Sequence, residues 1–137
     1  MYSKKIPAEM KQIVLILNNC KNQEECLKKA YDIITNRYRG YRWATLTHFD
    51  NLFITDPERL WNKKILICTN LNHLLKITLI HTKFFTEADI QTKWTLIWFI
   101  SLHQYLRVRV NGSKFINVDP WGKAYGVKFG GYSNGFH

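Results

Sequence analysis

The sequence predicts an α+β fold in which helices come first and an antiparallel sheet follows. Two segments near the N-terminus and one in mid-chain place apolar residues at helical spacing. The last third of the chain instead alternates apolar and polar residues with a period of two, as strands do. Because the sequence has no repeats, linkers or low-complexity tracts, residues 1–137 are expected to form a single domain.

The two N-terminal helices are expected within residues 7–19 and residues 22–40. Pro7 stands at the start of the first, where its missing N–H costs nothing. Asn22 and Glu25 have the spacing of a capping box at the start of the second, which stops at a glycine. The apolar stripes of these two helices are Met10, Ile13, Val14 and Leu17 in the first, and Leu27, Tyr31, Ile34 and Tyr38 in the second.

The middle of the chain predicts a short capped helical turn over residues 56–62, then an apolar entry segment that runs into a helix ending near residue 80. Cys68 falls at or beside the first residue of that helix. A capped turn at residues 86–89 ends the helical part. The residues of the central helix expected to face inward are Leu71, Leu74, Leu75, Thr78 and Leu79.

Strands are expected over residues 94–100, 103–110 and 113–119, with a turn at Asn111 and Gly112 between the last two. If one face of this hairpin is buried, the even-numbered set should point inward. That set is Leu102, Leu106, Val108, Val110, Ile116 and Val118. The outward, polar set is then His103, Tyr105, Arg107, Arg109, Asn117 and Asp119.

Asp119 is the only carboxylate after Asp89, in a segment that holds six Lys or Arg residues. A three-residue loop ending in Gly112 keeps the two apolar faces matched and sets His103 directly opposite Asp119. The pattern therefore predicts a His–Asp pair. The alternative is that Asp119 merely begins a turn before Pro120 and that His103 is an ordinary surface residue.

Cys68 is the candidate nucleophile for such a pair, since a helix N-terminus stabilises a thiolate through its dipole and its free backbone N–H groups. A carboxylate on one imidazole nitrogen would leave the other nitrogen to take the thiol proton. The alternative is that Cys68 is inert core packing, because it follows an apolar run and cysteine is commonly buried.

Two stretches, "LWNKKILICTNLNHLLKITLI" and "HQYLRVRVNGSKFINVDPWG", resemble the core of the transglutaminase-like superfamily of papain-fold cysteine enzymes. In that family a Cys opens a buried helix, a His begins a strand and an Asp ends the next strand. The resemblance covers roughly residues 60–122 and implies a papain-like core with a catalytic triad of Cys68, His103 and Asp119. It implies acyl transfer on peptide or protein amides without a cofactor or metal, with hydrolysis the expected outcome.

The resemblance also assigns supporting roles. The oxyanion would be held by the Cys68 backbone N–H and a second donor, for which the indoles of Trp43 and Trp61 are candidates, although a tryptophan at such a position is more often a core aromatic. Trp121 would shield the His–Asp bond from water. The sequence departs from the family at Leu66, where members often carry a small residue. The chain lacks acidic calcium loops, so calcium dependence is not expected.

Other function classes stay open on the sequence alone. A net charge of +10 suits an anionic partner, so a basic nucleic-acid-binding protein is one alternative. A catalytically inactive binding module with the same fold is another. Arg107 and Arg109 either select an acidic group or a C-terminal carboxylate on a substrate, or form a solvated strand face. The partner expected for the leading hypothesis is a peptide or protein substrate.

The compartment is predicted from what the sequence lacks. No apolar run reaches the roughly 18 residues of a membrane helix, and no signal peptide is recognised. Three cysteines are too few for a disulfide scaffold, although Cys20 and Cys26 could form one bridge or stay inert. A cytoplasmic protein is therefore the expectation.

Overall fold

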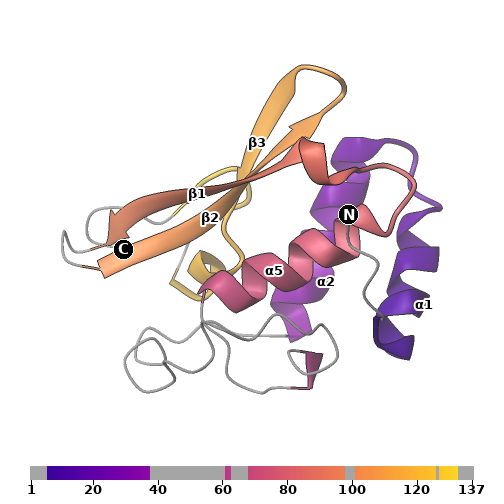
Figure 1. Cartoon of the computed structure of the whole chain (residues 1–137), viewed down its shortest axis with the longest axis horizontal. Helices are drawn as coiled ribbons and strands as arrows, with labels where there is room; N and C mark the ends of the chain where they lie inside the picture. Colours follow the sequence, from indigo (N-terminus) through magenta and orange to yellow (C-terminus); the bar gives the residue numbers. More distant parts are fainter. Residues whose placement is uncertain (1–5, 38–60, 63–67, 98–100, 126, 133–137) are drawn as a thin grey trace.

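A computed structural model describes residues 6–37, 61–62, 68–97, 101–125 and 127–132. Within these residues the fold is α+β, as predicted: helices come first and an antiparallel sheet of strand order β1-β2-β3 follows (Figure 1). The helices are α1 (Ala8–Leu17), α2 (Gln23–Arg37) and α5 (Cys68–Ile80), and the strands are β1 (Ile90–Ile97), β2 (Ser101–Val110) and β3 (Lys114–Val118). Short 3-10 helices η2 (Glu87–Asp89) and η3 (Trp121–Tyr125) flank the sheet in sequence.

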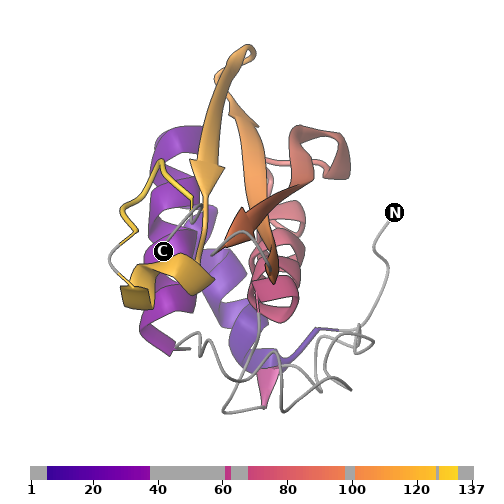
Figure 2. The ribbon, with the colours of Figure 1, turned by 90° about the vertical axis from the view of Figure 1, so that its left-hand side faces the viewer.

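Helix α5 is central, because it contacts α1, α2 and strand β2. Its predicted inward residues are all buried, and so are Asn72 and Ile77, which means that most of its circumference is covered. Figure 1 shows α5 running along the sheet, and Figure 2 shows β3 leading into η3. None of the helices in the described ranges is long and apolar enough to cross a membrane.

The N-terminal helices follow the predicted stripes. Met10, Val14 and Leu17 are buried on α1, and the described stripe residues of α2 are buried as well. Pro7 is the N-cap of α1 rather than its first residue. The Asn22 side chain accepts a hydrogen bond from the Glu25 N–H at 2.9 Å, so Asn22 caps α2 as predicted. The Glu25 carboxylate accepts the Lys21 N–H at 2.8 Å, not the Asn22 N–H that a full capping box would use. Tyr38, Gly40 and residues 56–60 lie outside the described residues.

Gln23, the first residue of α2, holds two later segments of the chain together. Its side-chain Nε2 donates to the Phe84 carbonyl at 2.7 Å, and its Oε1 accepts from the Asn111 N–H at 2.6 Å. One side chain therefore connects the start of α2 to the loop before β1 and to the tip of the β2–β3 hairpin.

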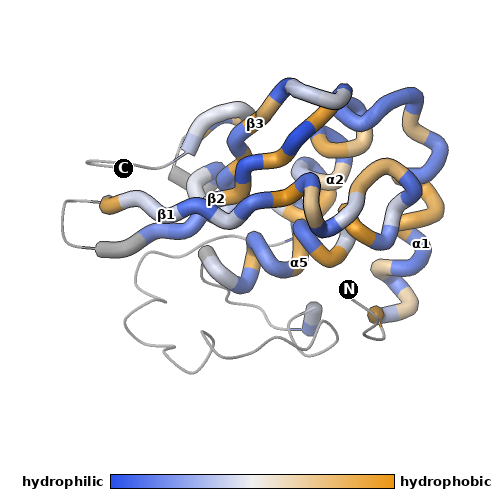
Figure 3. The backbone as a smooth tube through the Cα atoms, turned by 45° about the horizontal axis from the view of Figure 1, so that its top comes forward, coloured by the Kyte–Doolittle hydropathy of each residue, from blue (hydrophilic) through white to orange (hydrophobic). Residues whose placement is uncertain are grey.

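The strand alternation is confirmed on the helix side of the sheet. Leu106, Val108 and Val110 of β2 and Ile116 and Val118 of β3 are buried, and polar residues intervene along both strands (Figure 3). The side chain of Leu102 lies outside the described part. Strand β1 begins at Ile90, four positions before the predicted start, directly after the capping box of Thr86 and Asp89.

The predicted register of the hairpin was wrong: each residue of β2 pairs with a β3 residue two positions further along the chain than predicted. The three-residue loop is Asn111–Ser113 rather than a loop ending in Gly112, so Val110 pairs with Lys114 and Leu106 with Val118. The reason is that Asn111 joins Gly112 in the left-handed region, with φ of 53° and 90°, and the strand resumes one residue later than expected. A shift of two leaves every side chain on its predicted face.

Candidate active site

His103 and Asp119 form the buried pair at the end of the hairpin. His103 Nε2 lies 2.7 Å from Asp119 Oδ2, and the two residues are only 2% and 1% exposed. In the observed register His103 would face position 121, so Asp119 is its diagonal neighbour rather than the residue directly opposite. Diagonal neighbours across a strand pair remain within reach of long side chains. The predicted pairing therefore exists, although its register was wrong.

The outward, polar face predicted for this pair is not open to solvent. His103 does stand on the side of β2 opposite the apolar core, but Trp121 covers it there, with the two ring centroids 4.9 Å apart. Trp121 is itself 3% exposed. Alternation correctly places His103 on the polar face, yet alternation cannot tell which part of that face a later segment will cover.

Asp119 is fixed at both oxygens. Its Oδ1 accepts the Gly122 N–H at 3.0 Å, which η3 brings back toward the end of β3, while its Oδ2 faces His103. A carboxylate can only accept, so the Nε2 of His103 carries the hydrogen. A neutral imidazole then has its lone pair on Nδ1, the nitrogen that could act as a base.

Cys68 is the first residue of α5, as predicted. Its side chain lies outside the described part of the structure. The position of the Cys68 backbone relative to β2 can be related to that of Asn72. Four residues separate the two, so their backbone positions lie on the same face of the helix. The Asn72 side chain donates from Nδ2 to the Gln104 carbonyl at 2.8 Å. That bond joins the Cys68 face of α5 to the residue directly after His103.

The other two cysteines have a different environment. Cys20 and Cys26 are free thiols and both are buried. Burial raises the pKa of Cys26 to about 11, because a thiolate there would lose its hydration. At neutral pH this thiol is therefore protonated and unreactive.

The indole N–H of Trp61 already has a hydrogen-bond acceptor. Its Nε1 donates to Glu9 Oε2 at 2.9 Å, and the Arg37 guanidinium stacks on the ring, so Trp61 is a core aromatic rather than an oxyanion donor. Trp43, the other candidate, and Leu66, the departure from the family pattern, lie outside the described residues. Within the described ranges, no cluster of three or more His, Cys, Asp or Glu could hold a metal ion.

Sequence reasoning missed three contributors to this site. Asn72 links α5 to β2, Gly122 holds Asp119, and Tyr31 of α2 lies close enough to feel the Asp119 charge. Burial first, and then the charges of Asp119 and Asp32, raise the pKa of Tyr31 to about 12. The polar Asn72 within an apolar helix was the only visible signal, since a buried amide needs a partner.

Comparison with known proteins adds no assignment. No family model matches the chain, and neither a curated protein nor a solved structure does so. The function of the protein is therefore inferred from the geometry of these residues and from the motif resemblance.

Proposed function

We propose that the protein is a transglutaminase-like cysteine enzyme with a papain-like core, acting on peptide or protein amides through Cys68, His103 and Asp119. The buried His103–Asp119 hydrogen bond at 2.7 Å is the observation that carries the proposal. A histidine and a carboxylate are costly to bury together. An Asp119 that merely began a turn would accept the Gly122 N–H at Oδ1, as it does here, but it would not need a buried histidine at Oδ2.

The proposed reaction begins with transfer of the Cys68 proton to His103 Nδ1. The thiolate attacks the amide carbonyl carbon, and the carbonyl oxygen becomes an oxyanion next to the Cys68 backbone N–H. Collapse of this intermediate breaks the C–N bond, and the imidazolium gives its proton to the leaving amine. Asp119 keeps the ring in one tautomer and stabilises its charged form throughout.

Release of the acyl group completes the cycle. His103 takes a proton from water, which attacks the thioester and yields a carboxylic acid and the Cys68 thiol. We expect hydrolysis rather than transfer to a second amine, because lysine amines are protonated at neutral pH and become nucleophiles only where a site deprotonates them.

The test is the rate at which iodoacetamide alkylates each cysteine as a function of pH, followed by mass spectrometry. Cys68 should react well below pH 8.5, the usual region of a thiol pKa, in the wild-type protein. The His103→Ala and Asp119→Asn variants should lose that low-pH reactivity. Cys20 and Cys26 are internal controls in the same sample, since both are buried.

The opposite results are equally informative. If Cys68 is alkylated as an ordinary thiol in all three proteins, the catalytic proposal fails and the inactive binding module replaces it. If Cys68 does not react in the folded protein at any pH, although it reacts after denaturation, it is a core residue and the proposal fails as well.

A further inference from the structure

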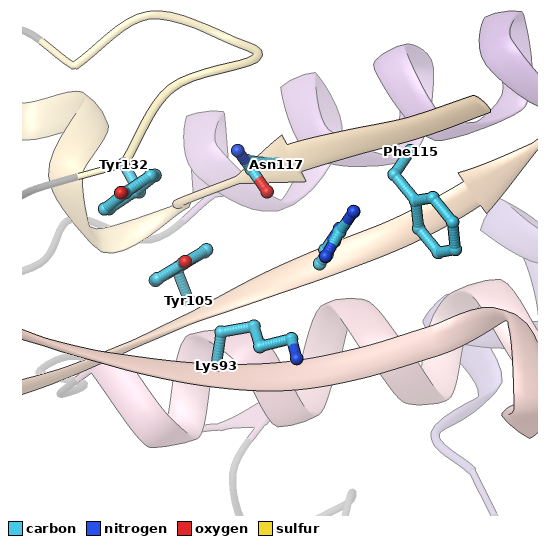
Figure 4. A pocket seen from close by; sticks show the side chains of 6 residues that line it. Lys93, Tyr105, Phe115, Asn117 and Tyr132 are labelled. Atoms are coloured by element: carbon cyan, nitrogen blue, oxygen red, sulfur yellow. The ribbon is translucent and has the colours of Figure 1, made fainter.

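The open face of the sheet carries a cavity of about 390 Å³ near the candidate active site (Figure 4). All three strands contribute to its wall, and the segment after η3 adds one tyrosine. Its volume is in the range of sites that take a small ligand or a few side-chain groups. The lining residues are Lys93, Tyr105, Arg107, Phe115, Asn117 and Tyr132.

Aromatic rings form the two ends of this cavity. Tyr105 and Tyr132 stack with ring centroids 4.1 Å apart and planes 6° apart, and Phe115 lies at the other end (Figure 4). Gly130 forms an antiparallel β-bridge with Asn117, which lays the segment of residues 127–132 alongside β3 and places Tyr132 against the sheet. The Arg107 guanidinium lies over the Phe115 ring at 4.3 Å, an arrangement that holds its charge in place.

The cavity is positively charged and contains no carboxylate among its lining residues. Lys93 and Arg107 have no acidic partner in the part of the chain that the structure describes, whereas Arg109, the next arginine on the same face, is paired with Asp89 at 2.8 Å. A guanidinium binds a carboxylate through two parallel hydrogen bonds, and the Asn117 amide can add a third donor.

The cavity and the candidate active site lie along the same strand, β2. Tyr105 and Arg107 follow His103 by two and four residues on the same face of β2. At about 3.3 Å per residue, Arg107 lies about 13 Å along the strand from His103. An extended peptide has the same rise, so that distance corresponds to about four of its residues.

We infer that this cavity binds a carboxylate of the peptide substrate, about four residues from the amide that Cys68 attacks. The inference rests on the proposed function and adds a substrate class to it: peptides with an acidic side chain or a C-terminal carboxylate at that distance. Tyr105 and Tyr132 contact the intervening residues, and Arg107 with Lys93 neutralises the carboxylate.

The test measures binding in the Cys68→Ala variant, so its result does not depend on acyl transfer. Three tetrapeptides are titrated into ¹⁵N-labelled protein: one capped at both ends with a central glutamate, the same peptide with glutamine, and an alanine peptide with a free C-terminus. The glutamate peptide should shift the amide signals of Tyr105, Arg107 and Asn117, and the glutamine peptide should not.

Two matched variants sharpen the result. Arg107→Gln should weaken binding of the acidic peptide about tenfold, because a charge-assisted bond is lost. Arg109→Gln makes the same change of charge two residues along the strand, and it should change the affinity less than about twofold because that arginine faces Asp89.

Each outcome decides the question. Binding of the glutamate peptide assigns the carboxylate to a side chain, and binding of the free-C-terminus peptide alone assigns it to a chain end. Equal binding of the glutamate and glutamine peptides overturns the inference, as does an unchanged affinity in Arg107→Gln. Displacement of the acidic peptide by micromolar single-stranded DNA would also overturn it, since the cavity would then serve nucleic acid. An inert Cys68 with intact peptide binding would overturn the proposed function alone.

Discussion

Two acid–base pairs start from strand β2 and differ mainly in burial. His103 and Asp119 are 2.7 Å apart with side chains 2% and 0% exposed, whereas Arg109 and Asp89 are 2.8 Å apart with side chains 43% and 13% exposed. The distances are nearly equal, so distance alone does not separate them. Water can replace either partner of the second pair, but it cannot reach the first. The same kind of contact is therefore a small surface contribution at one end of β2 and a structural requirement at the other.

Removal of the buried acid should have the largest effect. Asp119→Ala leaves His103 and the Gly122 N–H without their acceptor, and we expect the free energy of unfolding to fall by about 3–5 kcal/mol. Urea denaturation followed by tryptophan fluorescence measures it. Arg109→Ala is the matched control, because it breaks the exposed pair and leaves the Thr86–Asp89 capping box intact, and its expected loss is about 1 kcal/mol or less. Equal losses in the two variants would remove the distinction between the pairs.

Removal of the Asn72 side chain, which joins α5 to β2, should give the next largest loss of stability. Asn72→Ala leaves the Gln104 carbonyl without its buried donor, and we expect a loss of about 1–3 kcal/mol. Asn19→Ala makes the same change at an exposed side chain whose bond to the Leu15 carbonyl is long, at 3.4 Å, and it should change stability by less than about 0.5 kcal/mol. Urea unfolding of both variants tests this. An Asn72 variant as stable as the control would mean that α5 is held on β2 by apolar contacts alone.

Alkaline pH should reduce the stability of the protein through a second buried group, the Cys26 thiol. Its pKa rises from 9.0 to about 11 on folding, so between these values the folded state holds a proton that the unfolded state has released. The stability it contributes is full below pH 9 and is lost as pH rises toward 11, by at most about 1.4 kcal/mol per pH unit. Thermal unfolding across pH 8–12 should show a smaller decline between pH 9 and pH 11 in Cys26→Ala.

Tyr31 is a second group whose titration should lower stability at alkaline pH, but over a different pH range. Its pKa rises from 10.0 to about 12, so its contribution is lost later, between pH 10 and pH 12, and it should persist in the Cys26 variant. A decline of the same size and position in both proteins would show that Cys26 does not titrate as its burial requires.

The exposed pair should give the smallest effect and the opposite pH dependence. Burial alone would raise the pKa of Asp89, but hydrogen bonds from Thr86 and Arg109 outweigh it and hold this pKa below its usual value. Its contribution is therefore present above pH 4 and is lost as pH falls through the lowered pKa. Arg109→Ala should cost less than about 1 kcal/mol at pH 7 and less still in 1 M salt, measured by urea unfolding. A loss that salt leaves unchanged would mean that packing, not charge, holds Arg109.

Much of the fold could be predicted because local signals agreed with one another. The stripe of α2 and its Asn22 cap, and the alternation of β2 and β3, indicate the same elements from independent chemistry. The position of Cys68 at a helix start followed from the change in periodicity there. Faces were predicted better than registers, because parity needs only the apolar pattern whereas register needs the loop conformation.

The register error came from the local conformation of the Asn111–Ser113 loop, whereas the errors in burial came from contacts with segments far away in the chain. Alternation shows that His103 is on the polar face but does not show that it is buried, and the expectation that Trp121 shields it came from the family resemblance alone. In the same way nothing near Trp61 in the sequence shows that Glu9, 52 positions earlier, accepts its indole N–H. Such contacts join residues far apart in the chain, and local patterns contain no information about them.

The two hydrogen bonds of Gln23 bear on how long the folded state lasts. They join residues separated by 61 and 88 positions, so each of them closes a long loop of the chain. Because closing a long loop costs entropy before the contact repays it, we expect these two bonds to form after the rate-limiting step of folding. They therefore do little for the speed of folding and instead slow the first opening of the molecule. One amide at the start of α2 thus acts on the lifetime of the folded state, and through it on the exposure of this sheet to proteases and to aggregation.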